Sequence, residues 1–219
     1  MKNIILIAIL LFVFSCNGND NITEIDSSEI IVDGNEIMPL AVGNLWEYRE
    51  YEYQDTKLLA ERKVKIEVLD KIFVDVEGKK IEVYKLRESR IFEENNINEI
   101  YFILRNENDT IYWYGHSLKN DDEYYINKTV YVKYPIEVGE SWIQDHGDYK
   151  NYYSCESIDD IVKLKGNNYK CVRIRIGPGQ WYNDKYFSVG IGLVYEESTS
   201  GWEVNCNLRK QVLVNNILK

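Results

Sequence analysis

Few residues in this 219-residue chain have the type and spacing that a catalytic or metal site requires. The two histidines, His116 and His146, stand in polar segments outside any H-x-x-x-H or H-E-x-x-H spacing. Such spacing would place metal ligands on one face of a helix, so a metalloprotease-type site is not expected. A site that combines His146 with Asp145 and Asp148 has no distinctive pattern behind it. We therefore predict that the protein holds no metal.

Motifs for nucleophilic catalysis and for phosphate binding do not occur either. The chain has no G-x-S-x-G elbow and no Walker A sequence, and Gly190-Ile-Gly192 lies inside an apolar, strand-like run. With 36 acidic residues, chance carboxylate pairs are certain, so pairing alone does not indicate a glycosidase. We expect a protein that is not an enzyme and that uses no cofactor.

Charge and aromatic content narrow the range of partners. The formal net charge is −10 at pH 7 and there is no basic stripe, which excludes nucleic acid as an expected partner. Aromatic residues are biased toward Tyr, with 18 Tyr and 5 Trp against 6 Phe. Exposed Tyr and Trp can stack on a glycan or anchor a protein partner, although ordinary strand packing also uses them. The clusters in question are Tyr112-Trp-Tyr114, Tyr124-Tyr125, Tyr152-Tyr153 and Trp181-Tyr182.

Residues 1–15 have the pattern of a signal peptide. Lys2 precedes the apolar run Ile4–Phe14, which is shorter than the roughly 20 residues of a membrane-spanning helix. The run ends in Val-Phe-Ser before Cys16, which resembles the lipobox of bacterial lipoproteins. That resemblance implies cleavage before Cys16, acylation of this residue with chains such as palmitate, and attachment to a membrane. The alternative is a plain secretory signal with an incidental cysteine.

Residues 16–36 are expected to form a flexible tether, because they are rich in Asn, Asp, Ser and Glu and lack a helical period. No acidic residue follows Cys16 directly, and by the same resemblance this favours the outer membrane over retention in the inner membrane. We therefore expect a lipid-anchored protein of the cell envelope, on the periplasmic or the surface-facing side.

Three further cysteines could form a disulfide in the cell envelope. The envelope is oxidising, so one disulfide among Cys155, Cys171 and Cys206 is plausible. The Cys155–Cys171 pair closes the shortest loop and would clamp a predicted hairpin, so we prefer it, with Cys206 as the alternative partner of Cys155. A catalytic thiol is not expected, because no histidine lies near any of the three in the sequence.

The elements that must position these residues are organised around a motif that occurs twice. Its copies run from Pro39 to Trp46 and from Pro135 to Trp142, with the pattern Pro, aliphatic, any residue, Val, Gly, two free positions, Trp. Pro suits the entry to a strand or turn, Gly permits a positive φ, and Trp provides a large apolar anchor. These are structural roles. The motif residues are Pro39, Gly43, Trp46, Pro135, Gly139 and Trp142.

Alternating and apolar runs between turn residues predict a mainly β fold with little helix. Turn signals at Gly78, Asn106–Asp109 and Gly166–Asn168 each connect two strand-like runs, and Lys185–Glu197 is expected to be one strand bent at its two glycines. The fold class is an antiparallel curled sheet, sandwich or incomplete barrel over residues 37–219. The repeated motif suggests two similar halves, 37–133 and 134–219.

The paired motifs, the Val76-Glu-Gly78 turn and the late Gly190–Val194 run resemble a broad group of uncharacterised bacterial lipoproteins. The resemblance implies the location and the β architecture and brings no activity. We expect a non-catalytic binding or scaffolding domain with a protein or glycan partner. The alternatives are a carrier that holds a lipid or acyl chain in an open β cavity and, less favoured, an envelope hydrolase that gathers a histidine with carboxylates in a cleft.

Overall fold

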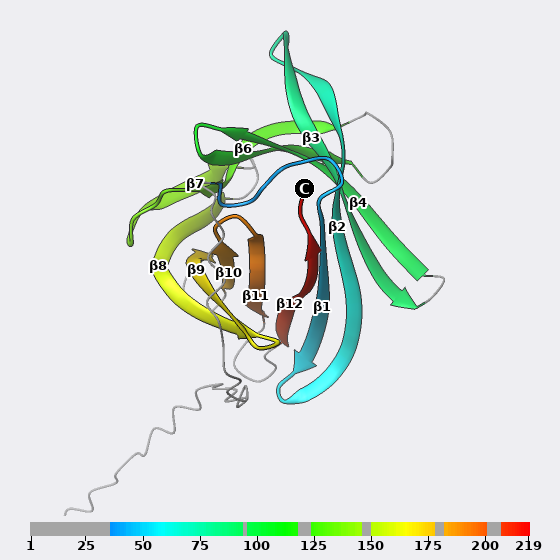
Figure 1. Ribbon diagram of the computed structural model, residues 1–219, viewed down its shortest axis with the longest axis vertical. Helices are drawn as coiled ribbons and strands as arrows, with labels where there is room; N and C mark the ends of the chain where they lie inside the picture. The colour runs from blue at the N-terminus through cyan, green and yellow to red at the C-terminus, as the bar shows by residue number, and fades with distance from the viewer. Residues whose placement is uncertain (1–35, 94–95, 118–123, 146–149, 178–181, 201–206) are drawn as a thin grey trace, which may run out of the picture.

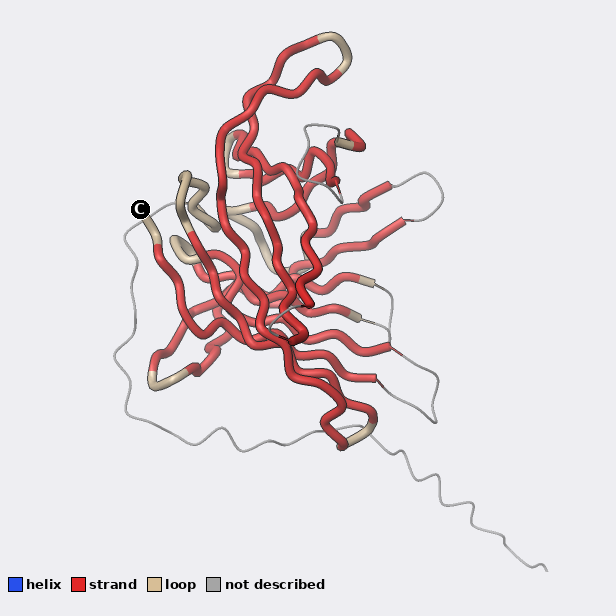
Figure 2. Tube along the Cα trace, turned by 90° about the vertical axis from the view of Figure 1, so that its right-hand side faces the viewer, coloured by secondary structure: helices blue, strands red, loops and turns tan. Residues whose placement is uncertain are grey.

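The computed structural model of the protein describes residues 36–93, 96–117, 124–145, 150–177, 182–200 and 207–219. These residues form twelve β-strands. Figure 2 shows the strands and their connecting loops, with no helix among the described residues. The strands make one antiparallel sheet that curls into a nearly closed barrel (Figure 1), which confirms the mainly β, incomplete-barrel prediction. Over the same ranges, no helix is long and apolar enough to cross a membrane.

The sheet follows the order of the chain. The first six strands are β1 (Leu45–Gln54), β2 (Lys57–Val76), β3 (Lys79–Glu93), β4 (Asn96–Glu107), β5 (Thr110–Ser117) and β6 (Tyr125–Lys133). The other six are β7 (Ser141–Asp145), β8 (Lys150–Leu164), β9 (Asn167–Ile176), β10 (Asn183–Ser188), β11 (Gly192–Ser200) and β12 (Asn207–Ile217). The spatial order is β6-β5-β4-β3-β2-β1-β12-β11-β10-β9-β8-β7. Pairing of β1 with β12 therefore joins two six-stranded meanders, and β6 and β7 are the edges.

Both copies of the repeated motif form the same turn. Gly43 and Gly139 each have φ +87°. The Gly43 N–H donates to Val68 O of β2, and the Gly139 N–H donates to Cys155 O of β8, both at 2.8 Å. Each motif thus ties the start of its own meander to the second strand of that meander, so the sequence repeat corresponds to a repeated local structure.

Replacing Gly139 by alanine is expected to lower the free energy of unfolding by about 1–2 kcal/mol, because left-handed backbone is costly for an L-residue. A Cβ at Gly139 would meet no atom within 4 Å, so the loss would report backbone strain alone. Urea unfolding measures it, with Val138→Ala in the same exposed turn as the control that should change little. Equal stability of Gly139→Ala and the parent protein would show that the left-handed backbone at this position imposes no strain on an alanine.

The Lys185–Glu197 region differs from the prediction. It contains two strands rather than one bent strand, since β10 ends at Ser188 and β11 begins at Gly192. Gly190 and Gly192 have φ +75° and +99°, and the Ile191 N–H donates to Ser188 O at 3.1 Å. Two positive φ values this close together reverse the chain, so the single-strand prediction was wrong.

The apolar core fills the interior of the barrel around the start of β1. Alternation along β1 turns Trp46 and Tyr48 inward, and both are fully buried. Residues 36–41, ahead of the first motif turn, pack their apolar side chains into the same core, and the Gly190 N–H donates to Glu36 O at 2.7 Å. The largest buried apolar side chains elsewhere in this core include Leu86, Leu104, Ile111, Ile174 and Phe187.

Candidate functional site

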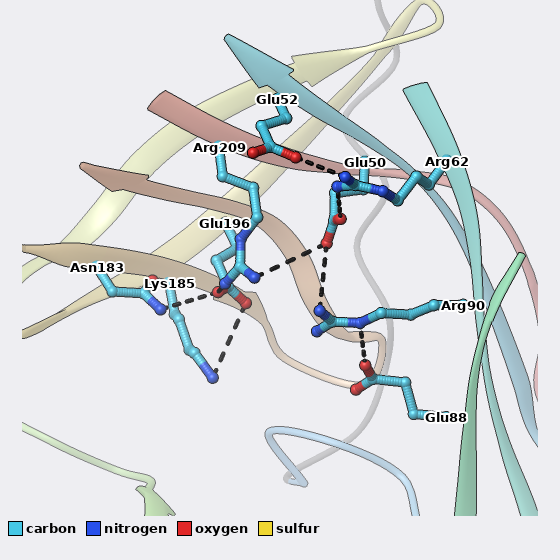
Figure 3. A network of polar contacts seen from close by, with 9 residues as sticks. All are labelled: Glu50, Glu52, Arg62, Glu88, Arg90, Asn183, Lys185, Glu196 and Arg209. Atoms are coloured by element: carbon cyan, nitrogen blue, oxygen red, sulfur yellow. Dashed lines mark hydrogen bonds and ion pairs between the residues drawn. The ribbon is translucent and has the colours of Figure 1, made fainter. Parts of the chain in front are cut away.

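Charged side chains replace the apolar core farther along β1. Glu50 follows Trp46 and Tyr48 on the inward face and is only 1% exposed. Burying an unpaired carboxylate would cost several kcal/mol, so partners must converge on it from other strands. Figure 3 shows that they do, in a network contributed by β1, β2, β3, β10, β11 and β12. Its members are Glu50, Glu52, Arg62, Glu88, Arg90, Asn183, Lys185, Glu196 and Arg209.

Glu50 is the centre of this network. Its Oε1 accepts a hydrogen bond from Arg62 Nη1 at 2.9 Å. Its Oε2 lies 4.0 Å from Arg90 Nη1 and 4.0 Å from Arg209 Nη1, which is ion-pair distance but too long for hydrogen bonds. Three guanidinium groups from three different strands therefore surround one buried carboxylate.

Each of these arginines also meets an outer carboxylate. Arg62 Nη2 lies 2.6 Å from Glu52 Oε2, and Arg90 Nε lies 2.6 Å from Glu88 Oε1. Arg209 Nη2 lies 3.3 Å from Glu196 Oε1, and the same oxygen accepts a 2.8 Å hydrogen bond from the Asn183 side chain. The other carboxylate oxygen of Glu196, Oε2, lies 3.9 Å from Lys185 Nζ. The network thus contains four basic and four acidic side chains and is balanced in charge.

Two members of the network, Glu196 and Arg90, have pKa values that their neighbours shift toward the charged form. Burial alone would raise the pKa of Glu196, but Lys185, Arg209 and Asn183 together lower it below the ordinary value. Burial likewise disfavours the Arg90 cation, yet Glu88 and Glu50 raise its pKa. Glu196 is therefore a carboxylate at neutral pH and not a proton donor.

A polar pocket of about 360 Å³ opens beside this network. Two buried atoms in its lining, Glu50 Oε2 and Arg62 Nε, have no hydrogen-bond partner among the described residues. One is an acceptor and the other a donor, but both atoms are covered by their neighbours and are not presented at the pocket surface. The lining comprises Glu50, Glu52, Arg62, Arg90, Ser198, Asn207, Leu208 and Arg209.

The motif residues lie away from this pocket, at the apolar end. Trp46 Nε1 donates to Ile191 O at 2.6 Å, whereas Trp142 stacks on Tyr153 with ring centroids 5.0 Å apart. Pro39 O accepts a 2.9 Å hydrogen bond from the Asn44 side chain, and Pro135 follows a cis peptide bond. The motif consequently has a place in the turns and the core, and none in the pocket.

Cys155 and Cys171 are buried free thiols in the structure. They lie on the neighbouring strands β8 and β9, but Cys155 is opposite Ile174, three positions along β9 from Cys171. The Cys155–Cys171 bridge preferred from the sequence is thus not formed in the structure. Cys16 and Cys206 lie outside the described residues.

Both thiols are expected to resist labelling in the native protein. Burial, with Asp160 nearby, raises the pKa of Cys171 to about 12, and burial also raises the pKa of Cys155. In a Cys16→Ser, Cys206→Ser background, a chromogenic disulfide reagent at pH 8 should detect two thiols only after unfolding in urea. Rapid labelling of the native protein would contradict their burial, and no labelling in urea before reduction would show that the bridge forms.

The remaining candidates from the sequence are scattered. His116 is exposed on β5, 6.4 Å between ring centroids from both Trp113 and Tyr125, while His146 and Trp181 lie outside the described residues. Among the described residues, no three potential ligands gather in a way that could hold a metal ion. Most of the aromatic clusters serve packing, as with Trp113, which stacks on Phe102 at 5.1 Å; Tyr125 and Tyr152 are exposed.

Sequence reasoning missed the charged network altogether. A usable signal existed in β1, where period-two alternation from Trp46 and Tyr48 places Glu50 on the buried face. A charge at an inward position implies a counter-charge elsewhere in the fold. Arg62 lies opposite Glu50 in the β1–β2 hairpin, but Arg209 cannot be identified as a partner from the sequence because it is far from Glu50 along the chain.

Comparison with known proteins adds structural neighbours. No protein-family model matches the chain, and no curated protein matches its sequence. A solved structure described as a candidate exported protein with a YmcC-like fold, from Bacteroides fragilis, is 12% identical with a TM-score of 0.49, covering 83% of this chain and 98% of its own. A candidate lipoprotein from Parabacteroides distasonis is 13% identical with a TM-score of 0.46, covering 85% and 100%. At these identities the similarity carries no residue roles over to this chain.

Proposed function

We propose that this protein is a lipid-anchored component of the cell envelope whose barrel binds a neutral, hydroxyl-rich ligand, such as a glycan, without transforming it. The lipobox-like sequence before Cys16 supports the anchor and, with the residues after it, an outer-membrane location. The observation that carries the binding role is the polar pocket, lined by three arginines and two glutamates, beside the charge-balanced network of the buried Glu50.

The charges in the pocket favour a neutral ligand. An anion would have to approach Glu50 and Glu52, and a cation would meet Arg62, Arg90 and Arg209. A hydroxyl group both donates and accepts, so it can pair with the carboxylates of the lining as well as with its guanidinium groups. The volume of about 360 Å³ lies at the small end of the usual range for ligand pockets, roughly 300–1,000 Å³, and suits one or two sugar units better than a long polymer.

The electrostatics support binding over hydrolysis. Glycoside hydrolysis needs one carboxylic acid whose pKa is raised, so that it can protonate the leaving group. Glu196, whose pKa is lowered by Lys185 and Arg209, does not line the pocket. The two carboxylates that do, Glu50 and Glu52, are both paired with Arg62. Glu50 is hydrogen-bonded by Arg62 and faces two more guanidinium groups. Pairing of this kind suits a fixed recognition site.

A carrier that holds an acyl chain within the barrel is less well supported. The apolar end of the interior is occupied by Trp46, Tyr48 and Phe187, all fully buried. The space beside the network is polar instead, and an aliphatic chain there would take the charged lining out of water without pairing with it.

A glycan array probed with the mature Cys16→Ser protein tests the proposal. Neutral saccharides should bind and acidic ones should bind less well. Asn207→Trp, which places a large side chain in the lining of the pocket, should weaken binding at least tenfold, while Asn215→Trp at the other end of β12 should not. The absence of any glycan ligand, a preference for acidic glycans, or equal binding by Asn207→Trp would each count against the pocket as the site.

The anchor is tested separately by membrane fractionation. The parent protein should stay with the membranes after a carbonate wash, and the Cys16→Ser protein should be released. Retention of Cys16→Ser in the membrane fraction would contradict lipid anchoring at this residue.

A further inference from the structure

A second hollow lies on the outside of the barrel, where the β8–β9 hairpin folds back toward the sheet. β8 is strongly curved (Figure 1), and at the tip of its hairpin Lys165 Nζ donates to Val214 O of β12 at 2.9 Å. A groove of about 580 Å³ runs between this hairpin and the outer faces of β1, β10, β11 and β12. Its lining shares no residue with that of the polar pocket, and on β1 the two linings take alternate residues, Glu50 and Glu52 against Tyr51 and Tyr53.

The groove is apolar where an outer face would ordinarily be polar. On the outer face of β1, Glu47 and Arg49 give way to Tyr51 and Tyr53 as the strand enters the groove. On β12 the outward residues Val212 and Val214 line it, and the hairpin contributes Val162 and Leu164 from the opposite side. Concave apolar surface of this size on a solvated face is typical of a ligand site.

All the charged residues that line the groove are basic. They are Lys163, Lys165 and Lys210, and no carboxylate from the described residues lines it, although the chain has 36 acidic and 26 basic residues. Lys165 hydrogen-bonds to the backbone of β12, and Lys210 lies 3.9 Å from Glu197, which stands outside the lining. Three ammonium groups beside an apolar floor complement a ligand with a hydrocarbon body and an anionic head.

From this combination we propose that the outer groove binds a free long-chain fatty acid, with the aliphatic chain along the tyrosine and valine floor and the carboxylate toward the lysines. The groove is walled by the hairpin on one side and the sheet on the other, so it admits a single chain and not the flat surface of a bilayer. A saccharide could stack on the tyrosines but would leave Val212, Val214 and Leu164 uncovered. This site is independent of the polar pocket and does not rest on the function proposed for it.

Displacement of a fluorescent polyene fatty acid from delipidated, mature Cys16→Ser protein tests the site. Palmitate should displace the probe. Hexadecanol, which lacks the charge, and hexanoate, which lacks the long chain, should each need at least a tenfold higher concentration for the same displacement. Filling the groove with Val212→Trp should weaken palmitate at least tenfold, and Leu59→Trp, on an exposed position outside the groove, should leave it unchanged. The double variant Lys163→Glu, Lys210→Glu should bind palmitate more weakly and should bind hexadecanol as the parent protein does.

Several results would overturn the proposal. They are failure of the probe to bind, hexadecanol as effective as palmitate, or unchanged affinity in Val212→Trp. Val162→Trp fills the groove from the hairpin side and provides a second variant if Val212→Trp does not fold, as judged by urea unfolding. The last experiment is sedimentation of the protein with phosphatidylcholine–phosphatidylglycerol vesicles in place of fatty acid. If the protein sediments with the vesicles and Val212→Trp does not, the groove binds a membrane surface instead.

Discussion

Replacing Glu50 by leucine is expected to lower the free energy of unfolding by about 3–5 kcal/mol, the usual cost of removing one partner of a buried ion pair. The leucine would fit the buried position but would leave Arg62, Arg90 and Arg209 facing one another without their shared carboxylate. Like charges in a partly desolvated interior repel strongly, so the cost arises from the cations left behind. Urea unfolding followed by tryptophan fluorescence measures it.

Glu61→Leu is the matched control. Glu61 forms a 2.9 Å ion pair with Arg49, but both side chains are about half exposed, so the change should cost at most about 1 kcal/mol. If Glu50→Leu were as stable as Glu61→Leu, the pairs with Glu52, Glu88 and Glu196 would suffice to neutralise the three arginines, and the central role of Glu50 in the network would be wrong.

Replacing Trp46 by alanine is expected to cost about 3–5 kcal/mol, as large-to-small changes at fully buried aromatic residues do. The same change at Trp142, which stands at the equivalent place in the second motif and is only partly buried, should cost clearly less. The contrast follows from position: Trp46 leads into β1 at the join of the two meanders, while Trp142 leads into the edge strand β7.

A pair of phenylalanine variants separates the hydrogen bond from the packing. Trp46→Phe loses the 2.6 Å bond to Ile191 O and leaves a buried carbonyl without its donor, which costs about 1–3 kcal/mol. Trp142 Nε1 has no hydrogen-bond partner among the described residues, so Trp142→Phe loses no such bond. Equal losses in the two phenylalanine variants would show that the Ile191 bond contributes little.

Much of the local structure could be predicted, because turns are encoded in few adjacent residues. The turn glycines Gly78 and Gly166 connect the strands that their neighbours predict, with φ +78° and +82°. Prediction failed at Gly190 and Gly192, where an apolar run hid a reversal of the chain. In that run hydrophobicity and backbone conformation gave conflicting signals, and the two glycines decided the conformation.

The site could not be predicted, because it depends on pairing between distant strands. β1 interleaves aromatic and charged residues, a pattern that predicts a half-exposed strand, and alternation places Glu50 on the face of Trp46 and Tyr48 without showing which side chains surround it. Glu50 became a buried charge because the sheet places Arg62, Arg90 and Arg209 around it. The outer groove likewise required the curvature of β8, which brings the tip of the hairpin to β12.

By itself, the sequence determined the β-strands, most of their turns, the repeated Pro…Trp turn and the lipobox-like start, since each rests on residues within about ten positions of one another. Only the tertiary structure decided how β1 and β12 join the two meanders into one barrel. The same folding decided which charges are buried together and which apolar residues line a groove. Burial and electrostatic pairing are properties of neighbours in space, and those neighbours are contributed by opposite ends of the chain.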